Sequence, residues 1–458
     1  MSLEVIILAA GQGTRMKSKL PKVLHAVAGK PMVGHVIDTA AGLSPANTHV
    51  VVGHGGDQLR HYFDNNFAQQ QLIVVEQAEQ LGTGHAVDQA MPAVAADSVA
   101  LILYGDVPLT RLDTLQALVA QAQENKLALL TVALDNPTGY GRIVRDDNDQ
   151  VVAIVEQKDA TEAQLAINEI NTGIMALPAS WLKQWLPKLS SDNAQGEYYL
   201  TDIIAMAAQS GKVIEAAHPN SEQEVQGVNN RLQLAELERW HQLQQANHWM
   251  TEGVTLADPA RVDFRGDIVI GQDVSLDINV ILEGSVTIGD NVSIGPNCVI
   301  KDSSIAAGTV VKANSMLDES VVAENCDIGP FARLRPGTVL ATKAKIGNFV
   351  ETKKTIVGEG SKINHLSYVG DAVLGKAVNV GAGTITCNYD GVNKFQTEIG
   401  DNAFIGSNTS LVAPVKVGVG GTTGAGSTIT KAIDDGALGV ARGKQTNLKS
   451  WKRPEKQA

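Results

Sequence analysis

The chain has 458 residues, too many for one ordinary hydrophobic core, so at least two domains are expected. Its formal net charge of −12 argues against a nucleic-acid surface, although small anionic ligands need only a few local cations. The start, MSLEVIILAAGQG, has no basic segment, and no apolar run reaches membrane-span length. Cys298, Cys326 and Cys387 form no CxxC pair and no metal spacing, so a cytoplasmic protein without membrane insertion is expected.

The first domain opens with EVIILAA, a continuous apolar run ended by glycine, which predicts a buried strand. The runs HVVV, LIVV, VALILY and LALLTVAL follow, separated by segments of helical character. This alternation indicates an α/β domain with a mostly parallel sheet.

The loop after the first strand, LAAGQGTRMKSKLPK, combines glycines with cations. Gly11 and Gly13 allow close backbone approach, and exposed amides beside Arg15 and Lys22 suit a polyphosphate. The loop lacks the third glycine of a Rossmann fingerprint and the Gly-Lys-Ser/Thr of a P-loop. A tight turn with solvated charges is the alternative interpretation.

The strand VALILY is followed at once by Gly105 and Asp106. An Asp just past the carboxyl end of a central strand lies where open α/β sheets bind ligands, and its carboxylate suits Mg²⁺. An ordinary helix cap or turn is the alternative.

The segment RLQLAELERWHQLQQANHWMTE, rich in Leu, Glu and Gln, predicts one linker helix. His241 and His248 lie seven residues apart on one face of this helix, which favours a packing surface over a metal site. The predicted boundaries are 1–229 for the α/β domain, 230–250 for the helix and 251–458 for the remainder.

The remainder is dominated by a six-residue repeat. Apolar residues recur every six positions, and each is followed two positions later by another. The first set is Val262, Ile268, Val274, Val280, Val286, Val292 and Cys298, and the second is Phe264, Ile270, Leu276, Leu282, Ile288, Ile294 and Ile300. Each unit therefore predicts a short strand with both ends facing inward, followed by a polar turn that often contains glycine. Three units give about 18 residues per coil, which predicts a parallel β-solenoid rather than a sandwich.

The repeat continues in looser form to about Thr430, with one interruption. Between Gly381 and Ile399 the chain inserts AGTITCNYDGVNKFQTE, a polar segment too long for a corner. Inserted loops on a solenoid usually carry the binding function, so a site is expected there.

Taken together, LAAGQGTRM, LPKVL, EQLGTGHA, YGDVPL, PTGYGRI, VEQKDA, EINTGI, GEYYLTD and GVNNR resemble motifs of the sugar-phosphate uridylyltransferases. With the solenoid motifs RLRPG, GNFVETKK, NHLSYVGDA, NVGAGTITCNYDG, FIGSN and VARGK, the chain resembles the bacterial bifunctional N-acetylglucosamine-1-phosphate uridyltransferase/glucosamine-1-phosphate acetyltransferases. The resemblance covers nearly the whole chain. It implies a Rossmann-like nucleotidyltransferase domain, a left-handed parallel β-helix and a homotrimer.

For the uridylyl site, the resemblance implies Mg²⁺ held by Asp106 and Asn229, with Arg15 and Lys22 neutralising the triphosphate. The implied nucleotide residues are Leu8, Ala9, Ala10, Gly11, Gln77, Gly82 and Thr83, and the implied sugar residues are Tyr104, Gly105, Gly141, Glu156 and Asn171. The phosphate of N-acetylglucosamine 1-phosphate attacks the α-phosphorus of UTP. Because that phosphate is already close to a dianion at neutral pH, the step needs no general base.

For the acetyl site, the resemblance implies His365 as the general base that deprotonates the amine of glucosamine 1-phosphate, with Glu351 orienting it. The repeat alone places His365 at a corner, pointing outward, where an ordinary surface histidine is the plainer interpretation. The implied sugar-phosphate residues are Arg335, Lys353, Tyr368 and Asn379, and those for acetyl-CoA are Ala382, Asn388, Tyr389, Ser407, Ala425 and Arg442. The basic tail offers charge either for the phosphates of CoA or only for solubility.

The resemblance thus implies a bifunctional enzyme that acetylates glucosamine 1-phosphate and then forms UDP-N-acetylglucosamine, which feeds peptidoglycan and lipopolysaccharide precursors. One alternative is a single-activity sugar nucleotidyltransferase with a structural or regulatory β-helix, and another is a nucleotide sensor on a solenoid spacer. His365 and the segment 382–398 favour the bifunctional enzyme, because a passive scaffold needs neither.

Overall fold

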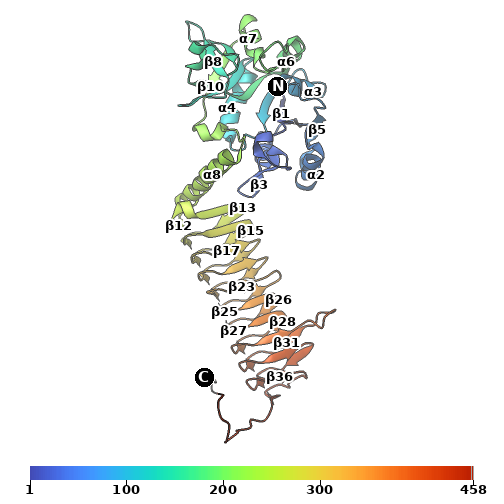
Figure 1. The fold of residues 1–458 in the computed structure, drawn as a ribbon, viewed down its shortest axis with the longest axis vertical. Coiled ribbons are helices and arrows are strands. Elements are labelled where there is room, and N and C mark those ends of the chain that lie inside the picture. Colours follow the sequence, from blue (N-terminus) through green and yellow to red (C-terminus); the bar gives the residue numbers. More distant parts are fainter. Residues whose placement is uncertain (455, 457–458) are drawn as a thin grey trace. The chain divides into compact units, whose positions relative to one another are not determined.

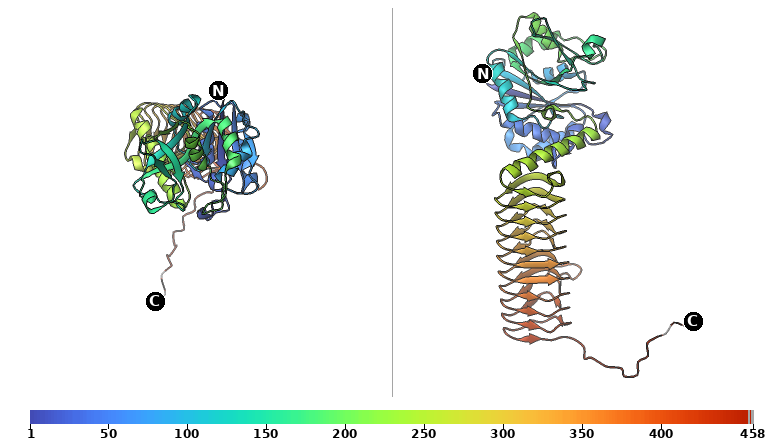
Figure 2. Two further views of the ribbon diagram at one scale, coloured as in Figure 1. Left: turned by 90° about the horizontal axis from the view of Figure 1, so that it is seen from above. Right: turned by 90° about the vertical axis from the view of Figure 1, so that its left-hand side faces the viewer.

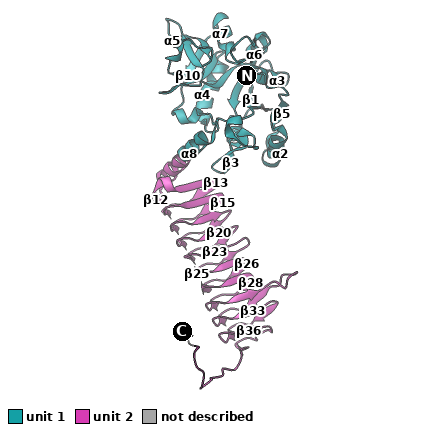
Figure 3. Ribbon diagram, in the orientation of Figure 1, with its two compact units in different colours: residues 1–241 teal, residues 242–458 magenta. Residues whose placement is uncertain are grey.

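The computed structural model describes residues 1–454 and 456, which fall into two compact units divided between His241 and Gln242 (Figure 3). This division lies inside helix α8 (Arg231–Thr251), the predicted linker helix. The domain boundaries stay a prediction, because a helix shared by both units marks no single residue as the border. No helix of the described residues is long and apolar enough to cross a membrane.

The first unit is an α/β domain on a nine-stranded sheet, with the central order β11-β7-β10-β6-β1-β4-β5 (Figure 1). These strands are β1 (Leu3–Ala9), β4 (Asn47–Val52), β5 (Ile73–Glu76), β6 (Val99–Tyr104), β7 (Leu127–Ala133), β10 (Glu169–Pro178) and β11 (Ile214–Ala217). The apolar runs predicted β1, β4, β5, β6 and β7 correctly. Strand β10 was missed, and it runs antiparallel between β6 and β7.

The apolar run of β1 is continuous because both faces of the sheet are covered. Ile6 and Leu8 belong to a hydrophobic cluster with α3 (Thr83–Ala90), α6 (Ala179–Trp185) and α7 (Asp202–Gln209). Val5 and Ile7 belong to another cluster, with α1 (Met32–Ala41), α2 (Gly56–Asn66) and α4 (Leu112–Gln123). The two cores hold β1 and β6 rigidly, so the loops at their carboxyl ends start from fixed points.

A hairpin stands off the central path of the sheet. Strands β8 (Arg142–Arg145) and β9 (Val151–Val155) pair with each other, and β8 also pairs with β10. Strand β10 itself is irregular between Asn171 and Met175, where Gly173 has a φ of 87°. The side chain of Tyr104 fills the space beside Gly173, because a Cβ there would lie 2.5 Å from the tyrosine ring.

The second unit is a parallel β-helix of short strands stacked coil upon coil (Figure 2). Every inward position of the repeat is buried except Ile268, which lies in β13 (Val262–Ile270), a strand paired on one side only. Coils are 18 residues long at Val262↔Val280 and 17 residues long at Val299↔Met316. The predicted fold class, a Rossmann-like domain, a linker helix and a left-handed parallel β-helix, is confirmed.

Asparagine as well as glycine makes the corners. Asn279, Asn297 and Asn314 all have φ near +60°, a region that asparagine tolerates better than most residues. Their side chains form a ladder, with Nδ2 of Asn279 donating to Asn297 at 2.8 Å and Nδ2 of Asn297 donating to Asn314 at 3.2 Å. The ladder satisfies polar groups that a corner would otherwise leave to water.

The interruption of the repeat is shorter than predicted. Residues Ile385–Cys387 form β30 and Thr397–Ile399 form β31, and both continue the ladder of the β-helix. The prediction of one loop over 382–398 was therefore wrong, because Thr386 and Thr397 turn inward and are buried like the residues of other coils. The loop that leaves the β-helix comprises residues 388–396.

Candidate active sites

A cavity of about 540 Å³ opens at the carboxyl ends of β1 and β6, the place that Asp106 predicted. It is lined by Leu8, Ala9, Ala10, Gly11, Gln12, Lys22, Val23, Gln77, Gln80, Gly82, Thr83, Ala86, Tyr104, Asp106 and Glu197. All the predicted nucleotide residues thus lie around one cavity. Gln12, Val23, Gln80, Ala86 and Glu197 were missed, and only their closeness in sequence to the glycine-rich loops could have suggested the first four.

The loop before α3 presents a polar edge to this cavity. Gln77 is 3% exposed, and its Nε2 donates to the carbonyl of Gly82 at 3.1 Å while lying 3.1 Å from Nδ1 of His85. Gly82 has a φ of 113°, and a Cβ there would lie 2.6 Å from the carbonyl oxygen of Tyr198. Only glycine fits this position, so the backbone of Gly82 is held open toward the cavity.

Four charged and polar residues meet where the metal was predicted. Nζ of Lys22 contacts Oδ2 of Asp106 and lies 3.4 Å from Oδ1 of Asn229. Nη2 of Arg15 donates to the same Oδ1 at 2.8 Å. The backbone amide of Val228 donates to the carbonyl of Asp106 at 3.0 Å, which keeps Asn229 beside Asp106 although the two are far apart in sequence. The two oxygens assigned to a metal therefore already share one cationic group.

The predicted sugar residues gather around the hairpin and the irregular part of β10. The amide of Asn171 donates to the carbonyl of Gly141 at 2.9 Å. A Cβ on Gly141 would lie 3.3 Å from Oε1 of Glu156, which accepts a 3.1 Å hydrogen bond from Thr201. Burial raises the pKa of Glu156. Burial, and then the charges of Glu156 and Asp106, raise the pKa of Tyr104, so this phenol lies between the sugar group and the metal group.

In the second unit, His365 ends strand β27 (Lys362–His365) at a corner and is exposed, as predicted. Its Nδ1 lies 2.8 Å from Oδ1 of Asn348, the residue in register with it one coil earlier. Glu351 was expected to orient His365, but its Oε1 instead accepts a 2.7 Å hydrogen bond from Arg335. Asn348 was missed, and the signal for it is its distance of one coil from His365.

Predicted ligands of the sugar phosphate form a cationic group nearby. The charges of Lys394 and Arg335 lower the pKa of Lys353, so these three side chains lie close enough to repel one another. Lys394 belongs to the loop 388–396 and was missed. Tyr368 is in register with Glu351, whereas Asn379 lies on a different face, in register with Lys362.

The predicted acetyl-CoA residues follow one corner of the β-helix. Backbone hydrogen bonds between successive coils run from Gly383 to His365, from Asn408 to Ala382 and from Gly426 to Ser407. The corner positions in this column are His365, Ala382, Ser407 and Ala425. Nη1 of Arg442 donates to the carbonyl of Ala425 at 2.8 Å.

The loop 388–396 starts beside this column. Asn388 is buried and donates from Nδ2 to Oδ2 of Asp371, whereas Tyr389 and Cys387 are exposed. The loop therefore leaves the β-helix from a fixed residue and presents Tyr389 to solvent.

An α/β domain with a nucleotide-sized cavity, followed by a hexapeptide β-helix with an exposed histidine, defines a nucleotidyltransferase joined to a solenoid. A family model described as the MobA-like NTP transferase domain matches residues 5–252, and one described as the GMPPB C-terminal domain matches residues 264–352. The Bifunctional protein GlmU of Marinobacter nauticus is 64% identical over 454 residues, 99% of each chain. That of Alcanivorax borkumensis is 62% identical over 456 residues, 100% of each chain. A solved UDP-glucose pyrophosphorylase complexed with UDP-glucose is 17% identical, with a TM-score of 0.44, over 53% of this chain and 98% of that one.

The chain belongs to the family of bifunctional GlmU proteins. The resemblance inferred from the motifs is thereby confirmed.

Proposed function

We propose that the chain makes UDP-N-acetylglucosamine, acetylating glucosamine 1-phosphate with acetyl-CoA in the second unit and transferring UMP from UTP in the first. The identity to bifunctional relatives over the whole chain supports both activities. The carrying observation is the corner column from His365 to Ala425, because a β-helix that serves only as a scaffold needs no oriented histidine there. A single-activity nucleotidyltransferase is not favoured.

In the first unit, the nucleotide occupies the cavity at the ends of β1 and β6, with Gln77 and Gly82 toward the base and Arg15 and Lys22 toward the phosphates. Asp106 and Asn229 would hold Mg²⁺ there. Their oxygens fit it because they already converge on the cation of Lys22, and Mg²⁺ usually takes one or two protein oxygens together with substrate phosphates. When bound, the metal supplies charge neutralisation. The protein supplies in-line placement, and the sugar phosphate attacks without a general base.

In the second unit, His365 acts as the base. If Oδ1 of Asn348 accepts the proton on Nδ1, Nε2 keeps its lone pair and can take a proton from the sugar amine. The amine nitrogen then attacks the acetyl carbonyl, the carbon–sulfur bond breaks and CoA leaves as the thiol. A backbone amide near Ala382 can stabilise the oxyanion. The exposed Cys387 is a free thiol that a direct transfer does not need.

We also propose a homotrimer in the cytoplasm. Phe331, Phe349 and Leu366 occupy successive coils at the corner next to His365 and are 49%, 53% and 64% exposed. The rings of the two phenylalanines stack at 5.2 Å. A contiguous apolar ridge of this kind marks an interface, and a second subunit would close the acetyl site. The three free cysteines agree with a reducing compartment.

A paired assay tests the function. With acetyl-CoA and glucosamine 1-phosphate, the purified chain should release free thiol, and with UTP and N-acetylglucosamine 1-phosphate it should release pyrophosphate. Pyrophosphate without thiol would support the single-activity alternative, and neither product would support the sensor.

A further inference from the structure

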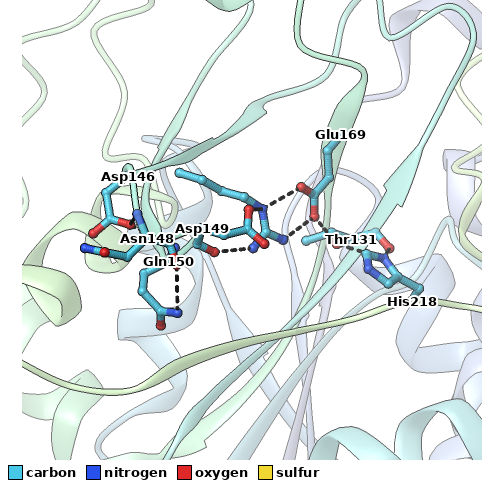
Figure 4. A network of polar contacts seen from close by, with 8 residues as sticks. Thr131, Asp146, Asn148, Asp149, Gln150, Glu169 and His218 are labelled. Atoms are coloured by element: carbon cyan, nitrogen blue, oxygen red, sulfur yellow. Dashed lines mark hydrogen bonds and ion pairs between the residues drawn. The ribbon is translucent and has the colours of Figure 1, made fainter.

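A network of polar contacts in the first unit belongs to neither group of candidate site residues (Figure 4). It joins Thr131 on β7, Arg145 at the end of β8, Glu169 at the start of β10 and His218 just after β11. Oγ1 of Thr131 donates to Oε1 of Glu169 at 2.7 Å and lies 3.2 Å from Nδ1 of His218. The network therefore crosses from the centre of the sheet to the β8–β9 hairpin.

Arg145 is the residue that connects the hairpin to the sheet. Its Nε and Nη2 donate to the two carboxylate oxygens of Glu169 at 2.9 and 2.8 Å, while Nη1 donates to the carbonyl of Asp149 in the hairpin turn at 2.9 Å. The arginine and glutamate side chains are only 25% and 20% exposed. A bidentate, largely desolvated pair of this kind has a narrow choice of geometry.

The charge state of Glu169 supports a permanent ion pair. Burial by itself raises its pKa, but the hydrogen bonds from Arg145 and Thr131 outweigh burial, and the pKa is lowered. The carboxylate therefore stays ionised at neutral pH.

The hairpin carries two of the residues proposed for the sugar. Gly141 directly precedes β8 and Glu156 directly follows β9, so both lie at its open end. In the described part of the chain, β8 meets β10 through one registered pair, Ile170↔Arg142, beside the hydrogen bond between Asn171 and Gly141. So short a contact leaves the tilt of the hairpin to be set by other interactions.

We propose that the ion pair of Arg145 and Glu169 positions the sugar pocket, by fixing the β8–β9 hairpin so that Gly141, Glu156 and Asn171 face the same N-acetylated sugar phosphate. Glu169 lies two residues before Asn171 on β10, so the clamp and the pocket share a strand. Arg145 acts through the hairpin and touches no substrate. The inference rests on the proposed uridylyl function.

The test uses Arg145→Met in the full chain, with pyrophosphate release measured while each substrate is varied separately. We expect kcat/KM for the sugar phosphate to fall about 10- to 100-fold, the usual cost of a displacement of about 1 Å in a site. The KM for UTP should change less than about twofold, because its cavity is lined by other elements. Arg145→Lys should give an intermediate loss, since lysine keeps the charge but not the bidentate geometry.

Matched controls separate positioning from folding. Arg111→Met removes the ion pair with Asp113, whose side chains are 57% and 55% exposed, and should leave both KM values unchanged. Glu169→Gln keeps the shape of the side chain and should reproduce the selective loss if Arg145→Met proves too unstable to assay.

Two failures can be told apart. If the parent chain releases no pyrophosphate from these substrates, the proposed function is wrong. If the parent is active but Arg145→Met and Glu169→Gln keep the parental kcat/KM for the sugar phosphate, or raise both KM values equally, the positioning role is wrong.

Discussion

Nδ1 of His365 lies 2.8 Å from Oδ1 of Asn348, and the two residues are in register on neighbouring coils of the β-helix. An amide oxygen only accepts hydrogen bonds, so this contact places the ring proton on Nδ1 and leaves Nε2 as the basic nitrogen. A stack of coils thus does for this histidine what a carboxylate does in many active sites, without adding a charge.

Replacing the amide by a carboxylate should expose this relationship. In Asn348→Asp, the new negative charge favours the imidazolium, so the pKa of His365 rises. Thiol release should then lose activity on the acid side at a pH about one unit higher than in the parent, since a shift of one unit corresponds to about 1.4 kcal/mol. Thiol release measured against pH checks this, with pyrophosphate release as the control. An acid limb identical to that of the parent would mean that Asn348 does not contact the catalytic ring.

Removing the ring itself should be more costly. His365→Ala should lower thiol release by about 10² to 10⁴, the usual worth of a general base. No other histidine follows α8 in the sequence to replace it. The loss should shrink as pH rises, because more of the amine then arrives deprotonated. Circular dichroism should stay parental, since an exposed corner side chain adds little to the core. A variant as fast as the parent near neutral pH would remove His365 from the mechanism.

The metal group of the first unit should be separable from acetyl transfer. Asp106→Ala removes one of the two oxygens that share the cation of Lys22, and we expect pyrophosphate release to be abolished. Thiol release should remain, because the proposed acetyl residues all lie in the other compact unit. Binding of Mn²⁺ in the presence of UTP, followed by electron paramagnetic resonance, should weaken in parallel. An equal loss of both products would contradict two independent sites.

The apolar ridge should control assembly. Phe349→Asp places a charge within the stacked pair of Phe331 and Phe349, so the oligomer should dissociate and thiol release should fall while pyrophosphate release persists. Analytical ultracentrifugation measures the mass. Ile356→Asp is the control, because this side chain is similarly exposed (48%) on a different face of the β-helix. If both variants keep the parental mass, the ridge is not the interface.

The first unit should lose stability in acid through a pair of histidines. The ring centroids of His35 and His241 lie 5.8 Å apart; burial, and then the charge of His35, lower the pKa of His241 to about 4. Burial also lowers the pKa of His35, with Lys30 and Glu238 as the nearby charges.

Because these rings bind protons more weakly in the folded state, the unfolded chain takes up protons first as pH falls below about 6.5. Stability should be constant above that pH and should fall by about 1.4 kcal/mol per unit and per histidine toward pH 4. Urea unfolding of the first unit at several pH values measures the slope, and His241→Gln should reduce it. A slope unchanged in His241→Gln would assign the acid sensitivity to other groups.

The sequence by itself determined the elements whose information is local. The period of six residues identified the inward positions of the β-helix, because a strand alternates its faces and a flat coil must repeat. The runs around β1 and β6 predicted a sheet covered on both faces, and Asp106 followed from its place at a strand end. The positions of His365 and of the glycine-rich loop could likewise be found by reading along the chain.

Only the tertiary structure decided which distant residues meet. Asn348 reaches His365 because that coil has 17 residues, and a coil of 18 would put another side chain there; the repeat varies between the two lengths without a local signal. The pairing of Asn229 with Lys22 depends on a backbone hydrogen bond between Val228 and Asp106, and the clamp of Arg145 on Glu169 depends on β10 running antiparallel. Such contacts form when whole elements pack, and the packing energy is shared among many residues, so no short segment carries it.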